Sequence, residues 1–240
     1  MHVKSRYIWS GIFAAGVILF ALLGSRALVA DAALQVGNQF FGGGMPYNLN
    51  VADMSYRTAL LLDPNVEDAW HQRARIAFLR GDFKLATTMI NTQIELHGDT
   101  FMASYYIRGL IAGYAGRYGD AEKDFSKFLE WSPTNWAAAN DLAWIYFSQG
   151  KFKEAAHWTA QSLKFSPYNP WLLLTNGMSE YNLGNKEKAK EQLVKAKEAA
   201  ATLTPANWSR SYPGNDPRIA LEGLAQFRAT IDKNLELVNK

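Results

Sequence analysis

A spacing of 34 residues recurs along the middle of this 240-residue chain. Pro133 and Pro167 stand 34 residues apart, and they close two similar phrases, FLEWSPTN and SLKFSPYN. Small residues repeat at the same spacing in three columns, which are Gly109, Ala143 and Gly177; Gly116, Gly150 and Gly184; and Ala121, Ala155 and Ala189. A repeat of this length indicates a stack of similar helical units, each too small to bury a core alone.

The three columns have a physical reason in the packing of antiparallel helices. Small side chains at a helix crossing let two backbones approach, while larger residues interlock around them. A glycine after the first helix of each pair permits a tight turn into the second helix. A proline after the second helix cannot continue it, so the chain turns into the next pair.

The positions of these residues resemble the pattern of the tetratricopeptide repeat (TPR) family. The matching residues are Ala121, Phe125 and Pro133 in one copy; Leu142, Ala143, Tyr146, Gly150, Ala155 and Pro167 in the next; and Trp70, Ala74, Gly81 and Ala86 in an earlier one. The resemblance covers roughly residues 33–203, with full repeats at 67–100, 101–135, 136–169 and 170–203. It implies an all-α solenoid of helical hairpins wound as a right-handed superhelix.

An irregular hairpin is expected before the full repeats, over residues 27–66. Ala52, Tyr56, Ala59 and the phrase LLLDPN indicate its second helix, and the first would cover residues 27–41. Gly42, Gly43 and Gly44 would lengthen the turn between them.

The C-terminal part predicts a loop followed by a capping helix. Residues 204–215 are rich in turn formers, and the helix over residues 216–240 would have Asp216 as N-cap and Pro217 at its first position. One apolar stripe runs along this helix, made of Leu224, Phe227, Ile231, Leu235 and Val238. We expect the stripe to cover the open end of the solenoid.

The N-terminal part predicts a transmembrane helix over residues 7–25. Residues 7–24 carry no charge, and as a helix they would span roughly 27 Å, close to the thickness of a bilayer core. Tyr7 and Trp9 suit the interface, and Lys4 and Arg6 precede the span. Residues 1–6 are therefore expected in the cytoplasm and the repeats on the extracytoplasmic side, either periplasmic or at the cell surface.

A cleaved signal peptide is the alternative for this segment, because Ala30-Asp31-Ala32 offers a cleavage site of small residues. The apolar run is longer than the usual core of a signal peptide, and Arg26 lies between it and that site. Both observations favour an uncleaved anchor.

Composition excludes several classes of function. The chain has no cysteine, which excludes disulfides, thiolate metal sites and cysteine nucleophiles. Three basic residues and no acid fall in the first 26 residues, so the remainder has 22 basic and 22 acidic residues. This balance gives no net positive charge of the kind that binds nucleic acid.

Catalytic and metal-binding motifs are missing from the sequence. The four histidines form no ligand pair at helical spacing, and neither HExxH nor GxSxG occurs. Gly42-Gly43-Gly44 has no strand before it and no Gly-Lys-Ser/Thr after it, which favours a flexible turn over a phosphate loop. We therefore predict no enzyme, no metal and no cofactor.

The TPR resemblance implies a concave groove lined by the first helix of each hairpin. The residues at the groove positions are Asp68, His71, Arg75 and Phe78; Tyr106, Leu110 and Tyr114; Asn140, Trp144 and Phe147; and Trp171, Leu174, Met178 and Tyr181. This set is mainly aromatic, which suits an apolar peptide or helix of a partner protein. The alternative is that these side chains pack repeat on repeat, or that the last helix folds into the groove.

These observations together predict a membrane-anchored interaction scaffold or adaptor that binds a partner peptide or helix. Two alternatives remain open: a structural subunit of an envelope complex whose groove is filled by the chain itself, and a secreted TPR protein released by signal-peptide cleavage.

Overall fold

The computed structural model describes residues 24–42 and 47–240, and within these ranges every regular element is helical. The chain divides into two compact units, Met1–Arg73 and Ala74–Lys240, each of which is described by itself. The predicted transmembrane segment at residues 7–25 lies almost wholly outside the described residues. Among the residues that are described, no helix is long and apolar enough to cross a bilayer.

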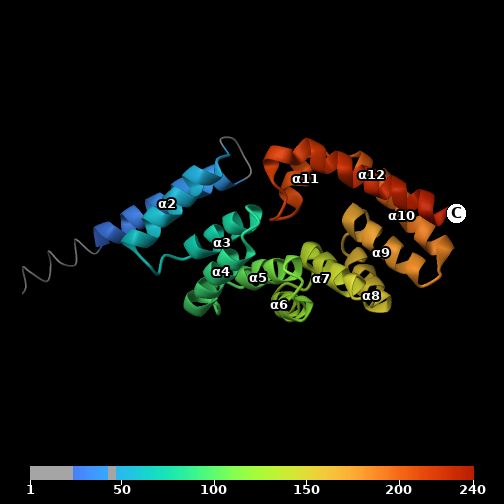
Figure 1. Ribbon diagram of the computed structural model, residues 1–240, viewed down its shortest axis with the longest axis horizontal. Helices are drawn as coiled ribbons and strands as arrows, with labels where there is room; N and C mark the ends of the chain where they lie inside the picture. The colour runs from blue at the N-terminus through green and yellow to red at the C-terminus, as the bar shows by residue number, and fades with distance from the viewer. Residues whose placement is uncertain (1–23, 43–46) are drawn as a thin grey trace, which may run out of the picture. The chain divides into compact units, whose positions relative to one another are not determined.

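Two helices form the described part of the first unit. One covers residues 24–41, and α2 (Leu49–Leu62) follows it after a short connection (Figure 1). The ring of Tyr56 lies against Gly37, and its hydroxyl donates a hydrogen bond of 2.8 Å to Oδ1 of Asn38. The side chain of Asn48 caps α2 by accepting from the amides of Asn50 and Val51. This pair occupies the region of the expected irregular hairpin.

A buried ion pair ties α2 to the start of α3 (Ala69–Leu79), the helix in which the first unit ends. The carboxylate of Asp53 accepts from Nε of Arg73 at 2.9 Å and from Nη2 of Arg57 at 3.0 Å. Burial alone would raise the pKa of Asp53, but these two guanidinium groups hold it below its usual value.

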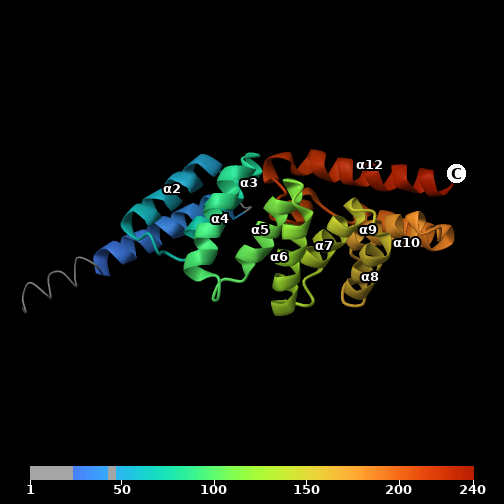
Figure 2. The same ribbon diagram turned by 60° about the horizontal axis from the view of Figure 1, so that its bottom comes forward.

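The second unit contains the remaining hairpins, in which consecutive helices lie side by side (Figures 1 and 2). Its helices after α3 are α4 (Phe83–His97), α5 (Ala103–Tyr114), α6 (Tyr118–Trp131), α7 (Trp136–Ser148), α8 (Phe152–Leu163), α9 (Pro170–Asn182) and α10 (Lys186–Ala201). The glycines at the hairpin turns, Gly81, Gly116, Gly150 and Gly184, all have φ between 73° and 84°. This left-handed conformation costs glycine little, which explains the glycine column.

The small residues of the other two columns lie where helices cross. Ala121, Ala143, Ala155 and Ala189 are fully buried. At Gly109 of α5, an added Cβ would come within 2.8 Å of Cδ1 and Cε1 of Phe125 in α6. The spacing read from the sequence therefore reflects backbone contact between α5 and α6.

Gly109→Ala should test this contact. Alanine normally stabilises a helix interior relative to glycine, but here the methyl group overlaps a buried ring, so we expect a loss of about 2 kcal/mol. Gly119→Ala in α6 is the matched control, because an added Cβ meets nothing within 4 Å there and should stabilise by about 0.5 kcal/mol. Urea unfolding of both variants measures the difference, and equal stabilities would contradict the packing argument.

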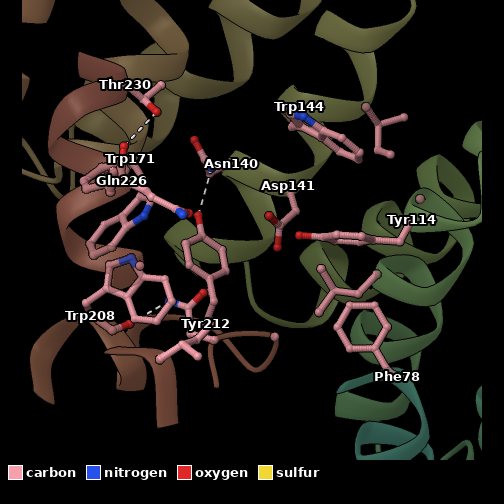
Figure 3. A pocket seen from close by; sticks show the side chains of 18 of the residues that line it. Phe78, Tyr114, Asn140, Asp141, Trp144, Trp171, Trp208, Tyr212, Gln226 and Thr230 are labelled. Atoms are coloured by element: carbon pink, nitrogen blue, oxygen red, sulfur yellow. Dashed lines mark hydrogen bonds between the residues drawn. The ribbon is translucent and has the colours of Figure 1, made fainter. Parts of the chain in front are cut away.

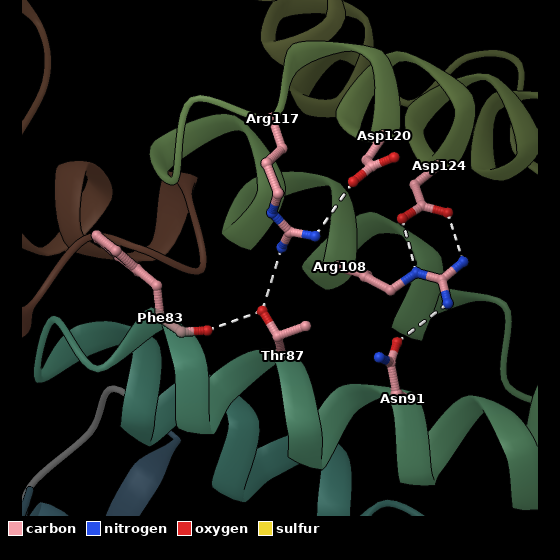
Figure 4. A network of polar contacts seen from close by, with 7 residues as sticks. All are labelled: Phe83, Thr87, Asn91, Arg108, Arg117, Asp120 and Asp124. Atoms are coloured by element: carbon pink, nitrogen blue, oxygen red, sulfur yellow. Dashed lines mark hydrogen bonds and ion pairs between the residues drawn. The ribbon is translucent and has the colours of Figure 1, made fainter.

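Polar contacts set the register of α4 against the next hairpin (Figure 4). The guanidinium of Arg108 in α5 donates two hydrogen bonds of 2.7 Å to the carboxylate of Asp124 in α6 and one of 3.2 Å to Oδ1 of Asn91 in α4. Arg117 bridges Asp120 and the hydroxyl of Thr87 in a more exposed position. The first contact links three helices through one side chain.

The C-terminal segment differs from the prediction in one respect. We predicted a loop over residues 204–215, whereas Pro205–Ser211 forms the short helix α11. A capping box between Thr204 and Asn207 starts this helix, and Pro205 occupies its first turn. The turn-forming residues read as a loop are therefore capping residues.

The final helix begins as expected at Asp216, whose side chain caps a 3-10 turn, Pro217–Ile219, before α12 (Ala220–Val238). The apolar stripe of α12 faces α10: Ile231 is buried with Ala196 and Ala200, and Val238 is buried with Ala189 and Leu193. In both views α12 runs along α10 and α9 (Figures 1 and 2). Arg228 also donates to the carbonyls of Ala200, Ala201 and Leu203 and so caps the end of α10.

Candidate partner-binding groove

A pocket of about 390 Å³ lies in the second unit, between the first helices of successive hairpins and the C-terminal segment. One wall comes from α3, α5 and α7, and the other comes from α9, α11, α12 and the connection between α11 and α12 (Figure 3). We call this pocket the groove pocket. Its size falls in the range of sites that enclose a side chain or a small ligand.

Aromatic rings cover both walls of the groove pocket. On the first wall, Tyr114 packs edge-on against Phe78, with ring centroids 5.1 Å apart, and lies 5.9 Å from Trp144. Tyr114 is 61% exposed and Trp144 is 40% exposed. Large rings left open in this way are more typical of a contact surface than of a core.

The C-terminal segment supplies the second wall. Trp171 of α9 stacks on Phe227 of α12 with ring centroids 4.9 Å apart, and Tyr212 meets Trp171 edge-on. The indole of Trp208 lies directly on Gly223, where any Cβ would overlap the ring. Glycine at position 223 therefore lets α11 approach α12 closely enough to complete this wall.

Helix α7 supplies two of the polar residues of the groove pocket, Asn140 and Asp141. The side chain of Asn135 caps the helix by accepting from the amide of Ala138, and this fixes where the first turn begins. Asn140 and Trp144 follow one turn apart on the same face, and Asp141 stands beside Asn140.

Asp141 is the one ionisable carboxyl group among the described residues that line the groove pocket. Its Oδ2 accepts a hydrogen bond of 2.7 Å from the hydroxyl of buried Tyr106, which fixes its orientation. Burial raises the pKa of Asp141 to about 7, although the hydrogen bond from Tyr106 favours the charged form. The hydroxyl of Tyr114 points toward the same carboxylate (Figure 3).

Asn140 is 8% exposed and makes one side-chain hydrogen bond, in which Nδ2 donates to the hydroxyl of Tyr212 at 2.8 Å. Its buried Oδ1 has no hydrogen-bond partner among the described residues. Such an oxygen is costly to leave unsatisfied, so the groove pocket retains an acceptor for a donor that arrives from outside.

The structure gathers six of the predicted groove residues around the groove pocket: Phe78, Leu110, Tyr114, Asn140, Trp144 and Trp171. Tyr106 lies behind Asp141 and lines a separate hollow with Trp136 and Arg210.

The other predicted positions do not line the groove pocket. Asp68 and His71 belong to the first unit, and His71 is buried. Arg75 is half-buried on α3, and the ring of Phe147 packs edge-on against Phe152 at the next hairpin turn.

At the last repeat, Leu174, Met178 and Tyr181 pack against the cluster that contains Val238 of α12. There the final helix fills the groove, which was the alternative left open by the sequence.

Among the groove-pocket residues that the sequence did not place there are Asp141, Trp208, Tyr212 and Phe227. Trp208 and Tyr212 stand four residues apart, a helical spacing that could have signalled α11 and its shared face. Asp141 had no such signal, because its neighbours come from three other parts of the chain.

Comparison with known proteins agrees with this architecture. Residues 106–170, which span from α5 to the start of α9, match the tetratricopeptide repeat family. No curated protein matches the chain as a relative.

Solved structures resemble this chain in fold. The type IV pilus biogenesis factor PilW is 20% identical with a TM-score of 0.65, and the match covers 88% of this chain and 99% of PilW. MamA is 18% identical with a TM-score of 0.60, and the match covers 72% of this chain and 92% of MamA. YrrB, described as a TPR protein with an unusual peptide-binding site, is 19% identical with a TM-score of 0.57, and the match covers 71% of this chain and 86% of YrrB. At these identities the likeness shows an all-α, TPR-like solenoid and nothing further.

Proposed function

We propose that this TPR protein is an adaptor that binds a segment of a partner protein in the groove pocket. The observation that carries this proposal is the pair of solvent-exposed rings, Tyr114 and Trp144, beside the buried polar groups of α7. Hot spots of protein interfaces combine large aromatic side chains with polar groups that can form hydrogen bonds to the partner. TPR proteins are typically scaffolds, which supports a role without catalysis.

The second candidate is a structural subunit whose groove is occupied by its own chain. The packing of Met178 and Tyr181 against the end of α12 favours it for the last repeat. It does not account for the open rings of Tyr114 and Trp144 at the other end of the same groove.

Site-specific photo-crosslinking in cells should separate these two functions. A benzophenone amino acid at Tyr114 is expected to capture a partner protein, while the same group at Tyr168 is expected to capture none. Tyr168 is 80% exposed and lies outside the groove pocket, so it controls for exposure. Trp144→Ala should then reduce the Tyr114 crosslink at least fivefold, because it removes a central ring. Equal capture at both positions would contradict a groove function.

We further propose that residues 7–25 anchor the adaptor in a membrane, with the repeats on the extracytoplasmic side. The uncharged run at residues 7–24 and the basic residues before it support this orientation. Fractionation of the same cells tests this proposal. The protein should remain in the membrane fraction after a carbonate wash, and its mass should be that of the uncleaved chain. A soluble form that begins near residue 33 would instead identify a cleaved signal peptide.

A further inference from the structure

The charge inside the groove pocket has one sign. Asp141 is the ionisable acid that lines it, and no lysine, arginine or histidine lines it among the described residues. Its other titratable neighbours are three phenols: Tyr106 and Tyr114 of α5 and Tyr212 of the connection before α12. A carboxylate held in an apolar pocket without a basic partner is costly.

The groups around Asp141 are suited to a planar cation. The rings of Tyr114 and Trp144 lie on one wall beside it, and those of Trp171 and Tyr212 lie on the other (Figure 3). Aromatic faces attract organic cations, most strongly where water is excluded. Asn140, which also lines the pocket, has a buried Oδ1 without a hydrogen-bond partner among the described residues and so offers a second, neutral acceptor.

We propose that the groove pocket takes an arginine side chain of the partner segment, with its guanidinium between the aromatic walls and hydrogen-bonded to Asp141 and Asn140. This inference rests on the proposed function, since it assigns the chemistry of the segment that the groove binds.

Arginine fits this site better than lysine for two reasons. Its guanidinium is planar and weakly hydrated, so it can stack on the rings and enter the pocket at a lower desolvation cost. Its five donors can also reach two acceptors at once, whereas an ammonium group is a compact point charge. Oδ2 of Asp141 already accepts from Tyr106, which leaves Oδ1 to accept from a guanidinium.

The test uses capped amino acids as probes of the full chain in detergent. Nα-acetyl-arginine methylamide should bind in the millimolar range and perturb the indole NMR signals of Trp144 and Trp171. The lysine analogue should bind at least threefold more weakly. The citrulline analogue, which has the same shape without the charge, should bind at least tenfold more weakly.

Acidity supplies a second readout, because the cation binds the ionised form of Asp141. With a pKa of about 7, the ionised fraction rises about tenfold between pH 6 and pH 8, so the affinity for the arginine probe should rise by about the same factor. Asp141→Asn should abolish both the binding of the arginine probe and this pH dependence. Asp120→Asn removes an acid outside the pocket and should change neither.

Each remaining outcome overturns the inference in a distinct way. Equal binding of the arginine and citrulline probes would mean that the pocket reads shape alone. Equal affinity for methylguanidinium would mean that it takes a free small cation and not a residue of a peptide. If Tyr114 still crosslinks a partner while no probe binds, the proposed function stands and the assignment of arginine is wrong.

Discussion

Arg108→Met is expected to destabilise the second unit by about 3 kcal/mol, although it removes no catalytic group and little apolar area. Asp124 is 4% exposed, and both of its carboxylate oxygens accept from Arg108. Methionine fills a similar length but leaves that carboxylate buried without its cation. The cost is the desolvation that the guanidinium now offsets.

Arg117→Met provides the matched control for this prediction. Arg117 also bonds an acid of α6 and a side chain of α4, but the side chains of Arg117 and Asp120 are 44% and 64% exposed. Exposed pairs of this kind contribute about 0.2–1 kcal/mol. Urea unfolding of the two variants should therefore give clearly different losses, and similar losses would show that Arg108 does not hold α4 to the α5/α6 hairpin.

The repeat architecture could be predicted because each of its signals is local. Gly116, Gly150 and Gly184 mark turns that need positive φ, and Gly109 and Ala143 mark helix crossings, so spacing alone locates both. Helix capping obeys the same local rules, yet Thr204 and Pro205 start a helix where the sequence predicts a loop. The signals of a helix start and of a turn use the same residue types.

The candidate site could be predicted only in part, because the family pattern places one wall and not the other. Tyr114, Asn140 and Trp144 follow from positions within each repeat. Trp208, Tyr212 and Phe227 reach the groove only because the apolar stripe of α12 docks on α10 and brings its N-terminal half over α9. That docking is a tertiary contact between segments about 30 residues apart. The sequence predicts the apolar stripe of α12, but it does not predict that the N-terminal half of α12 lies beside the groove.

The same docking explains why Asp141 escaped the sequence reading. An acid next to an asparagine on an amphipathic helix is usually a solvated residue, and nothing local distinguishes this one. Its environment is created by Tyr106 one hairpin earlier and by Tyr212 beyond the last repeat. A perturbed carboxyl group in a concave, aromatic site is a sign of function that only the folded chain displays.

Asp141→Asn is expected to make the protein more stable at pH 8 and to leave it nearly unchanged at pH 4. The pKa of Asp141 is about 7 in the folded chain, above its unfolded value of about 3.9. Between these values the folded state binds more protons than the unfolded state, so wild-type stability falls as pH rises from about 4 to about 7. The full deficit is present above pH 7, and solvent at the pocket mouth reduces it to about 2 kcal/mol.

Asparagine removes this deficit, since it carries no charge and its Oδ1 can accept the hydrogen bond from Tyr106. Urea unfolding of wild type, Asp141→Asn and Asp120→Asn at pH 4, 6 and 8 would measure the effect, and a gain that does not grow with pH would contradict it. The arginine probe should return the lost stability to wild type at pH 8 and give nothing to Asp141→Asn. That pair of results would show that the carboxylate of Asp141 lowers the stability of the empty fold and raises that of the occupied one.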